Sequence, residues 1–333
     1  MNLYLYFIVY IFISFALLIF YQKLSNTYKL FDKNDNEFSS KLKIPTGAGI
    51  VFFIVILISM IIFFKTEYVF LNLPERLWPL ITSISFLCII SFYDDFKPIN
   101  PIIKLFLQII FVYLSLASID VWSLGLPLKI SIFIIIVYWV YIINIINFID
   151  GADGFLTVFS ISFFLILLFA SIHYEFFFLK AITLTILPVL IVFLFFNKPN
   201  AKLYMGDTGS ILLGFMMGYV CIHLILNGHW SLTITLLAYP ICDCTITLVK
   251  KVAKGNLPWA RMYDYFFLMP IKKDYLLKKK VFKIIIITSL INITIGYAQI
   301  FFDLSYLFIL SLIANLSTIW IYYKSGNKKL TIS

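Results

Sequence analysis

Long apolar stretches dominate the chain, and short segments rich in charge, Pro, Gly or Asn separate them. A hydrocarbon core about 30 Å thick requires about 20 helical residues. Eleven stretches approach that length, at approximately 3–21, 47–64, 77–93, 101–118, 130–147, 155–172, 177–196, 209–226, 230–249, 282–301 and 304–323. The pattern predicts an all-α polytopic membrane protein with about 11 transmembrane helices, forming a single domain over residues 1–333.

Composition agrees with a membrane protein. Of the 333 residues, 62% are hydrophobic and 13% are charged, whereas soluble domains carry about 45–50% apolar and about 25% charged residues. A soluble globular protein is therefore excluded. The four cysteines fall in apolar stretches without C-x-x-C spacing, which indicates neither disulfides nor a zinc site, so oxygen ligands would hold any metal.

The basic residues predict the orientation of the chain. In the eleven-span arrangement, 22 of the 26 Lys and Arg residues fall on one side. Cytoplasmic loops carry the excess of Lys and Arg, so we expect the N-terminus outside and the C-terminus in the cytoplasm. Topology and attraction to anionic membrane lipid account for the net charge of +10, and nucleic acid is not implied.

Eleven of the sixteen acidic residues lie on the predicted cytoplasmic side. Asp94 and Asp95 follow the third span, Asp150 and Asp153 follow the fifth, and Asp207 precedes the eighth. A carboxylate beside a membrane is costly unless it is paired, hydrated or bound to a cation. Any one of these acids has an alternative interpretation as a hydrated helix-end charge, but their common depth favours a Mg²⁺ site with oxygen ligands.

Two of these acidic segments are rich in glycine. They read NIINFIDGADG at 144–154 and MGDTGS at 205–210. Glycine permits tight turns and close approach of the backbone to a ligand. The second segment also opens a long predicted helix, whose free N–H groups favour a phosphate.

Four segments together resemble the polyprenyl-phosphate N-acetylhexosamine-1-phosphate transferases. They are PTGAG at 45–49, YDDF at 93–96, NIINFIDGADG at 144–154 and AKLYMGDTGS at 201–210. The resemblance covers about residues 32–268, and residues 269–333 hold the end of the last cytoplasmic loop and two terminal spans.

The resemblance implies transfer of a sugar 1-phosphate from a UDP-N-acetylhexosamine-type donor to undecaprenyl phosphate, with release of UMP. The product would begin a lipid-linked surface glycan such as O-antigen or a cell-wall polymer. The active site would lie on the cytoplasmic face of a bacterial inner membrane. A homodimer is compatible with this architecture.

Carried over to matching positions, the resemblance makes Asp207 the first ligand of Mg²⁺ or Mn²⁺ and Asn147 the second. Asp94 and Asp95 would either help to place the metal or accept a proton from the lipid phosphate, with Asp94 the preferred base. Lys104 would neutralise a phosphate.

The family's uridine pocket maps to five positions: Asn144, Asp150, Gly151, Asp153 and Tyr204. The ring of Tyr204 would stack on uracil. The alternative for Tyr204 is an aromatic residue of the membrane interface.

The last cytoplasmic loop departs from the family, whose members usually carry histidines there. It reads PWARMYDYFFL at 258–268, which argues against the cell-wall pentapeptide branch. Arg261 could clamp the diphosphate as a planar bidentate donor, and Tyr263 or Asp264 could meet sugar hydroxyls. The lysines at 272, 273 and 278–280 are interpreted as a solvated charge run, and the three histidines as polar residues on the outer side.

Two other classes remain open. An inactive membrane scaffold related to the transferases would explain the missing histidines. A carrier or transporter could use the cytoplasmic carboxylates as a relay, although such proteins usually place ionisable groups near the middle of the membrane and contain paired repeats.

Overall fold

A computed structural model describes residues 3–31, 44–65, 77–255 and 264–327. These parts of the chain form an all-α bundle. The only pairing of extended backbone within them is an isolated bridge between Phe31 and Pro45.

Eleven long helices make up the bundle within the described residues, and short helices connect some of them. The long helices are α1 (Leu3–Thr27), α2 (Gly49–Lys65), α4 (Leu77–Phe96), α5 (Pro101–Ser115), α6 (Leu128–Phe148), α7 (Phe155–His173), α8 (Phe177–Asn197), α9 (Gly206–Leu226), α10 (Trp230–Ala253), α12 (Lys278–Phe301) and α13 (Phe308–Asn327). The short ones are η1 (Leu116–Ser118), η2 (Val121–Leu124), η3 (Phe266–Leu268), α11 (Met269–Lys273), η4 (Tyr275–Leu277) and η5 (Ser305–Leu307).

The predicted class of polytopic membrane protein is confirmed. Ten helical segments of the described chain are long and apolar enough to cross a membrane. The remaining long helix, α2, has 17 residues and matches the second of the eleven predicted stretches. The number of spans that cross the bilayer and their orientation stay predictions.

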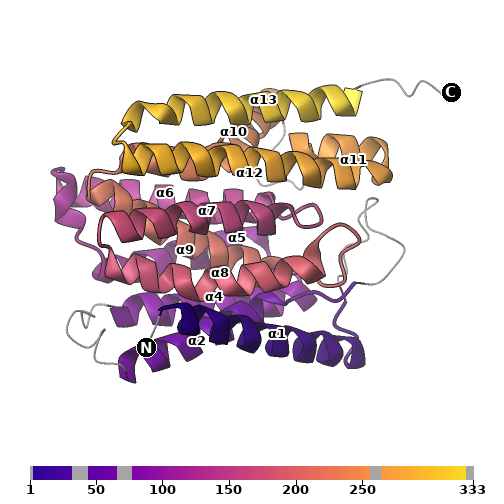
Figure 1. The fold of residues 1–333 in the computed structure, drawn as a ribbon, viewed down its shortest axis with the longest axis horizontal. Coiled ribbons are helices and arrows are strands. Elements are labelled where there is room, and N and C mark those ends of the chain that lie inside the picture. The colour runs from indigo at the N-terminus through magenta and orange to yellow at the C-terminus, as the bar shows by residue number, and fades with distance from the viewer. Residues whose placement is uncertain (1–2, 32–43, 66–76, 256–263, 328–333) are drawn as a thin grey trace.

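The helices lie side by side with nearly parallel axes (Figure 1). Across the face nearest the viewer, α13, α12, α7, α8 and α1 follow one another, and neighbouring members of this series are in contact. Behind them α9 contacts α6, α4 and α2. The termini of many helices therefore meet at each end of the bundle, which allows loops far apart in sequence to form one site.

Helix α9 lies at the centre, with most of its side chains buried. A helix can occupy this central position when it carries small residues, because they let the backbones of neighbouring helices approach closely. A Cβ on Gly214 would lie 2.8 Å from the Cα of Ile143, and a Cβ on Gly49 of α2 would overlap the backbone of Gly209. The indole of Trp139 fills the space over Gly218. The glycines therefore allow α9 to pack closely against α2 and α6.

Buried polar side chains join α12 to α13. Asn315 Nδ2 donates to Asn292 Oδ1 at 3.0 Å, and Ser311 Oγ donates to the same oxygen at 2.9 Å. Hydrogen bonds between membrane helices contribute about 0.6 to 2 kcal/mol each. These bonds stabilise the packing of α12 against α13.

The three histidines gather at the end of the bundle opposite the acidic segments. The ring of His229 stacks on Tyr174 with centroids 3.9 Å apart, and His223 meets Phe176 edge to face at 5.4 Å. His223 is 16 residues after Asp207 on the same helix, or about 24 Å along its axis. None of the histidines can therefore replace those missing from the last loop.

Candidate functional site

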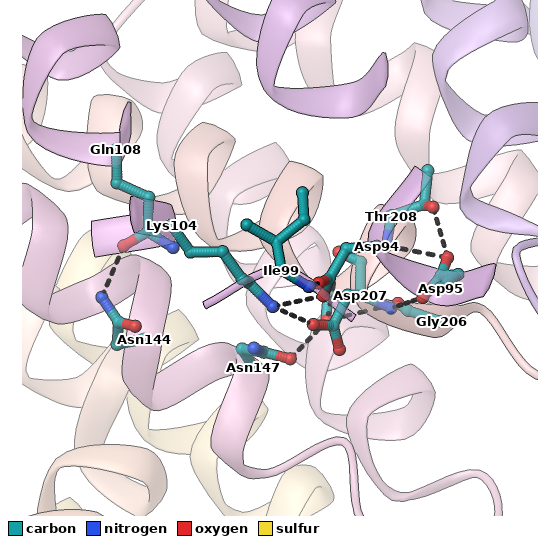
Figure 2. Close-up of polar contacts among 11 residues, drawn as sticks. Asp94, Asp95, Ile99, Lys104, Gln108, Asn144, Asn147, Gly206, Asp207 and Thr208 are labelled. Atoms are coloured by element: carbon teal, nitrogen blue, oxygen red, sulfur yellow. Dashed lines mark hydrogen bonds and ion pairs between the residues drawn. The ribbon is translucent and has the colours of Figure 1, made fainter. Parts of the chain in front are cut away.

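A largely buried lysine joins two of the predicted acidic residues (Figure 2). Lys104 Nζ lies 2.6 Å from Asp94 Oδ2 and also donates to Asp207 Oδ2. Asp94 lies in the last turn of α4, Lys104 in the first turn of α5 and Asp207 in the first turn of α9. The structure thus brings the α4–α5 turn and the start of α9, about a hundred residues further along the chain, to one point.

Local sequence explains why Lys104 faces Asp94. Pro101 occupies the first position of α5, and the side chain of Asn100 caps the helix by accepting from Ile102 N at 2.9 Å. Asp94 Oδ1 accepts from Ile99 N at 2.5 Å. These bonds close a tight turn between α4 and α5, and the turn holds the lysine over the carboxylate.

Asp95 points away from Lys104 and into the start of α9. Its Oδ1 accepts from Asp207 N at 2.7 Å, and its Oδ2 accepts from Thr208 Oγ1 at 2.5 Å and Thr208 N at 3.3 Å. Gly206 has a φ of 72°, and a Cβ there would collide with the Asp95 carboxylate. Asp95 therefore satisfies the free N–H groups of α9 and orients Asp207.

Two asparagines of α6 lie near these residues (Figure 2). Asn147 Oδ1 accepts from Ser210 Oγ at 2.9 Å, one turn beyond Asp207 on α9. Asn144 Nδ2 donates to Gln108 Oε1 at 2.8 Å, one turn beyond Lys104 on α5. Lys104, Asp94 and Asp207 together form the Lys104 cluster. Asn144 therefore lies beside this cluster, apart from the other residues predicted to bind uridine.

Asp153 and Tyr204 form a second group. Asp153 Oδ2 accepts from the backbone of Asn200 at 3.0 Å and of Ala201 at 3.3 Å, and Tyr204 OH lies 3.5 Å from its Oδ1. Asp153 thereby holds the loop that leads from α8 into Asp207. The second group is continuous with the first through this loop.

The loop is also held by other segments. Asn197 Oδ1 accepts from Thr157 Oγ1 at 2.8 Å, while its Nδ2 donates to Leu203 O at 3.1 Å. Tyr204 N donates to Pro45 O at 2.8 Å. The PTGAG segment at 45–49 therefore also supports the loop.

Of the remaining predicted residues, Gly151 and Asp150 lie at the edge of the site, and Arg261 lies outside the residues that the structure describes. Gly151 packs beneath η3, since a Cβ on it would lie 3.3 Å from Leu268 and 3.4 Å from Phe267. Asp150 lies in the same turn as Gly151. Arg261 lies outside the described residues, so its role stays a prediction.

Asp243 serves the last loop rather than the acidic cluster. It is fully buried and accepts from Tyr239 OH at 2.7 Å, from Thr247 Oγ1 at 3.2 Å and from the backbone N–H groups of Phe266 and Phe267 at 3.1 and 3.4 Å. Four donors account for a buried carboxylate without a metal. Asp243 thus anchors η3 to α10, which the sequence pattern did not indicate.

Tyr265 belongs to the histidine-free stretch 258–268, of which the structure describes residues 264–268. Its ring stacks on Phe148 with centroids 5.8 Å apart and on Phe267 at 6.1 Å. Burial raises the pKa of the Tyr265 hydroxyl above its ordinary value, so the group stays protonated and can donate a hydrogen bond.

The interpretation of Lys278 as part of a solvated charge run is wrong. Lys278 is 9% exposed, and its Nζ lies 3.5 Å from Asp153 Oδ2. Its position at the start of α12 turns it inward, whereas Lys279 and Lys280 face outward. The sequence of three consecutive lysines does not indicate which of them is buried, because that depends on how the helix is rotated about its axis.

The oxygen ligands suit Mg²⁺, although within the described chain no three His, Cys, Asp or Glu side chains are spaced to hold a metal. Mg²⁺ is usually bound through one or two carboxylates, with water and substrate phosphate completing its shell. The ammonium of Lys104 between Asp94 and Asp207 shows that both carboxylates face one position for positive charge. Asp207 and the nearby amide oxygen of Asn147 therefore fit the predicted cofactor.

The chain is similar to known transferases. Residues 77–225 match the model of glycosyl transferase family 4. A phospho-N-acetylmuramoyl-pentapeptide-transferase of Lactobacillus helveticus (strain DPC 4571) is 28% identical over 228 residues, covering 63% of this chain and 69% of the relative. A protein of the same name from Lactococcus lactis subsp. cremoris (strain MG1363) is 29% identical over 230 residues, covering 63% and 68%.

Fold and similarity thus support a membrane-embedded transferase, and residues 77–225 of the chain match glycosyl transferase family 4. This is the predicted family of polyprenyl-phosphate hexosamine-1-phosphate transferases. The matched segment contains the whole Lys104 cluster. The relatives carry the name of the branch against which the missing histidines argue, so the histidines alone do not decide the donor.

Proposed function

We propose that the protein transfers a sugar 1-phosphate from a UDP-N-acetylhexosamine-type donor to undecaprenyl phosphate and releases UMP. The contact of Lys104 with both Asp94 and Asp207 carries the proposal. Phosphoryl transfer between two anions depends chiefly on positioning and on neutralisation of charge. A cluster of one cation, two carboxylates and an amide oxygen at the helix ends supplies both.

In this reaction an oxygen of the lipid phosphate attacks the phosphorus that bears the sugar. The bond from that phosphorus to the bridging oxygen breaks, and UMP leaves with the electron pair. Lys104 neutralises the incoming lipid phosphate, exchanging one of its carboxylate partners for a phosphate oxygen. Asp94 accepts the proton when the phosphate arrives as a monoanion. With a second phosphate pKa of about 6, this base makes a small contribution at neutral pH.

The other residues hold and orient the substrates. Asp207 and Asn147 would hold Mg²⁺, which when bound neutralises charge on the diphosphate. Asp95 is a positioning residue that acts through Asp207. Asp153 and Tyr204 receive the nucleotide, and Asn144 supports the phosphate end beside Lys104.

The cellular setting follows from the same argument. Because the acceptor carries a polyprenyl tail, its phosphate must react at the membrane surface, where the cluster lies at the helix ends. We place the site on the cytoplasmic face of a bacterial inner membrane. The donor belongs to the N-acetylhexosamine class, and the relatives make the N-acetylmuramoyl-pentapeptide form a specific candidate beside simpler sugars.

One assay tests the proposal. Purified protein in nanodiscs is given undecaprenyl phosphate, Mg²⁺ and, one at a time, UDP-GlcNAc, UDP-GalNAc and UDP-MurNAc-pentapeptide, and UMP release is measured. We expect UMP with at least one donor and a lipid diphosphate sugar of matching mass. Folded protein that releases no UMP from any donor would refute the transferase and favour the scaffold or the carrier.

A further inference from the structure

Lys278 is set apart from its neighbours by burial. Residues 278–280 are all lysine, but only the first is buried in the bundle. Its side chain and that of Asp153 are each 10% exposed. It comes from α12, outside the segment of 77–225 that the family model matches. A lysine is rarely buried to this extent unless it is paired.

Its partners leave the ammonium capable of binding a further group. Nζ lies 3.5 Å from Asp153 Oδ2, longer than the roughly 2.7–2.9 Å of a tight charge-assisted hydrogen bond. It donates to Tyr275 OH at 2.9 Å and lies 4.1 Å from the centre of the Tyr275 ring. Because an ammonium has three donors, one can point to a ligand.

Lys278 and Asp153 place a hydrogen-bond donor and an acceptor side by side, and Tyr204 lies next to Asp153. Asp153 is fixed by two backbone N–H groups, and Tyr204 OH lies 3.5 Å from its other oxygen. A phosphate at Lys278 would also lie close to the Asp153 carboxylate, and the like charges would repel each other. A neutral heterocycle with adjacent N–H and C=O groups meets no such repulsion.

We propose that Lys278 adds a further contact to the uridine pocket expected at Asp153 and Tyr204, and that it helps to bind the hydrogen-bonding edge of the donor's uracil. The ammonium donates to a ring carbonyl, and the carboxylate accepts from the ring N–H, while the base lies beside Tyr204. Lys278 is thereby a specificity-determining residue for the nucleotide. The assignment rests on the proposed function, because a UDP donor supplies the base.

The test measures nucleotide binding without turnover. Full-length protein in nanodiscs with Mg²⁺ binds a fluorescent UDP derivative, and uridine, UMP and UDP are titrated as competitors. Lys278→Met should weaken uridine and UDP by a similar factor of about ten, the loss expected for one hydrogen bond to a charged group. Lys278→Arg keeps the charge and should retain most of the affinity. Lys279→Met, the exposed neighbour, should bind like wild type.

The uncharged nucleoside separates the outcomes. If Lys278→Met weakens UDP but not uridine, the lysine binds phosphate and the assignment is wrong; it is equally wrong if neither competitor changes. A wild-type protein that binds neither uridine nor UDP overturns the proposed function and this assignment with it. Thermal midpoints verify folding, and if Lys278→Met does not fold, Lys278→Gln replaces it with the same expected order.

Discussion

Removal of Asp95 should separate positioning from chemistry. Its carboxylate accepts three hydrogen bonds from the first turn of α9, at 2.7, 2.5 and 3.3 Å. The loss of a helix cap costs about 1 kcal/mol, and the loss of a partly buried negative charge at a helix N-terminus costs up to about 2 kcal/mol. We therefore expect Asp95→Ala to lower the free energy of unfolding by about 2–3 kcal/mol.

Activity should fall through Asp207, which loses the acceptor of its backbone N–H. A misplacement of about 1 Å in an active site can cost about a hundredfold in rate. The assay is the thermal midpoint in nanodiscs combined with UMP release per folded protein. Thr208→Val is the matched control because it removes one of the three bonds and leaves the carboxylate, so both effects should be smaller, at about 1 kcal/mol of stability.

Two results would contradict this reasoning. Asp95→Ala with an unchanged thermal midpoint but no activity would mean that the carboxylate acts directly on the reacting groups. Asp95→Ala with unchanged midpoint and activity would mean that the contacts with α9 contribute neither stability nor alignment.

Three further substitutions test other parts of the site. Asp207→Asn keeps the shape of the ligand and removes its charge, so UMP release should fall by orders of magnitude; near-normal turnover at limiting Mg²⁺ would rule out its role as a metal ligand. Lys104→Gln should raise the KM for undecaprenyl phosphate more than that for the UDP-sugar, because the lysine neutralises the acceptor; equal changes in steady-state kinetics would contradict this. Gly49→Ala should lower the thermal midpoint, since its methyl group meets the backbone of Gly209 and overpacking costs about 1–3 kcal/mol; a wild-type midpoint would show that α2 moves freely relative to α9.

Much of the architecture could be predicted from sequence. Each of the eleven apolar stretches corresponds to a helix, because in hydrocarbon a backbone must satisfy its own hydrogen bonds. The shared depth of Asp94, Lys104 and Asp207 also followed, since charged residues mark the ends of apolar spans. Depth is one coordinate, however, and a span pattern carries no information on which helices are neighbours.

The tertiary structure decided what each side chain at that depth does. Asp94 and Asp95 are adjacent in sequence but point to different partners, one to Lys104 and the other to the N–H groups of α9. Lys278 is buried and Lys279 is exposed for the same reason, as successive residues of a helix project about 100° apart. Sequence alone therefore determined the class of protein and the helix ends at which its charges lie. Only the packing of helices around α9 decided which charges meet, because electrostatic pairing acts over a few ångströms and depends on direction.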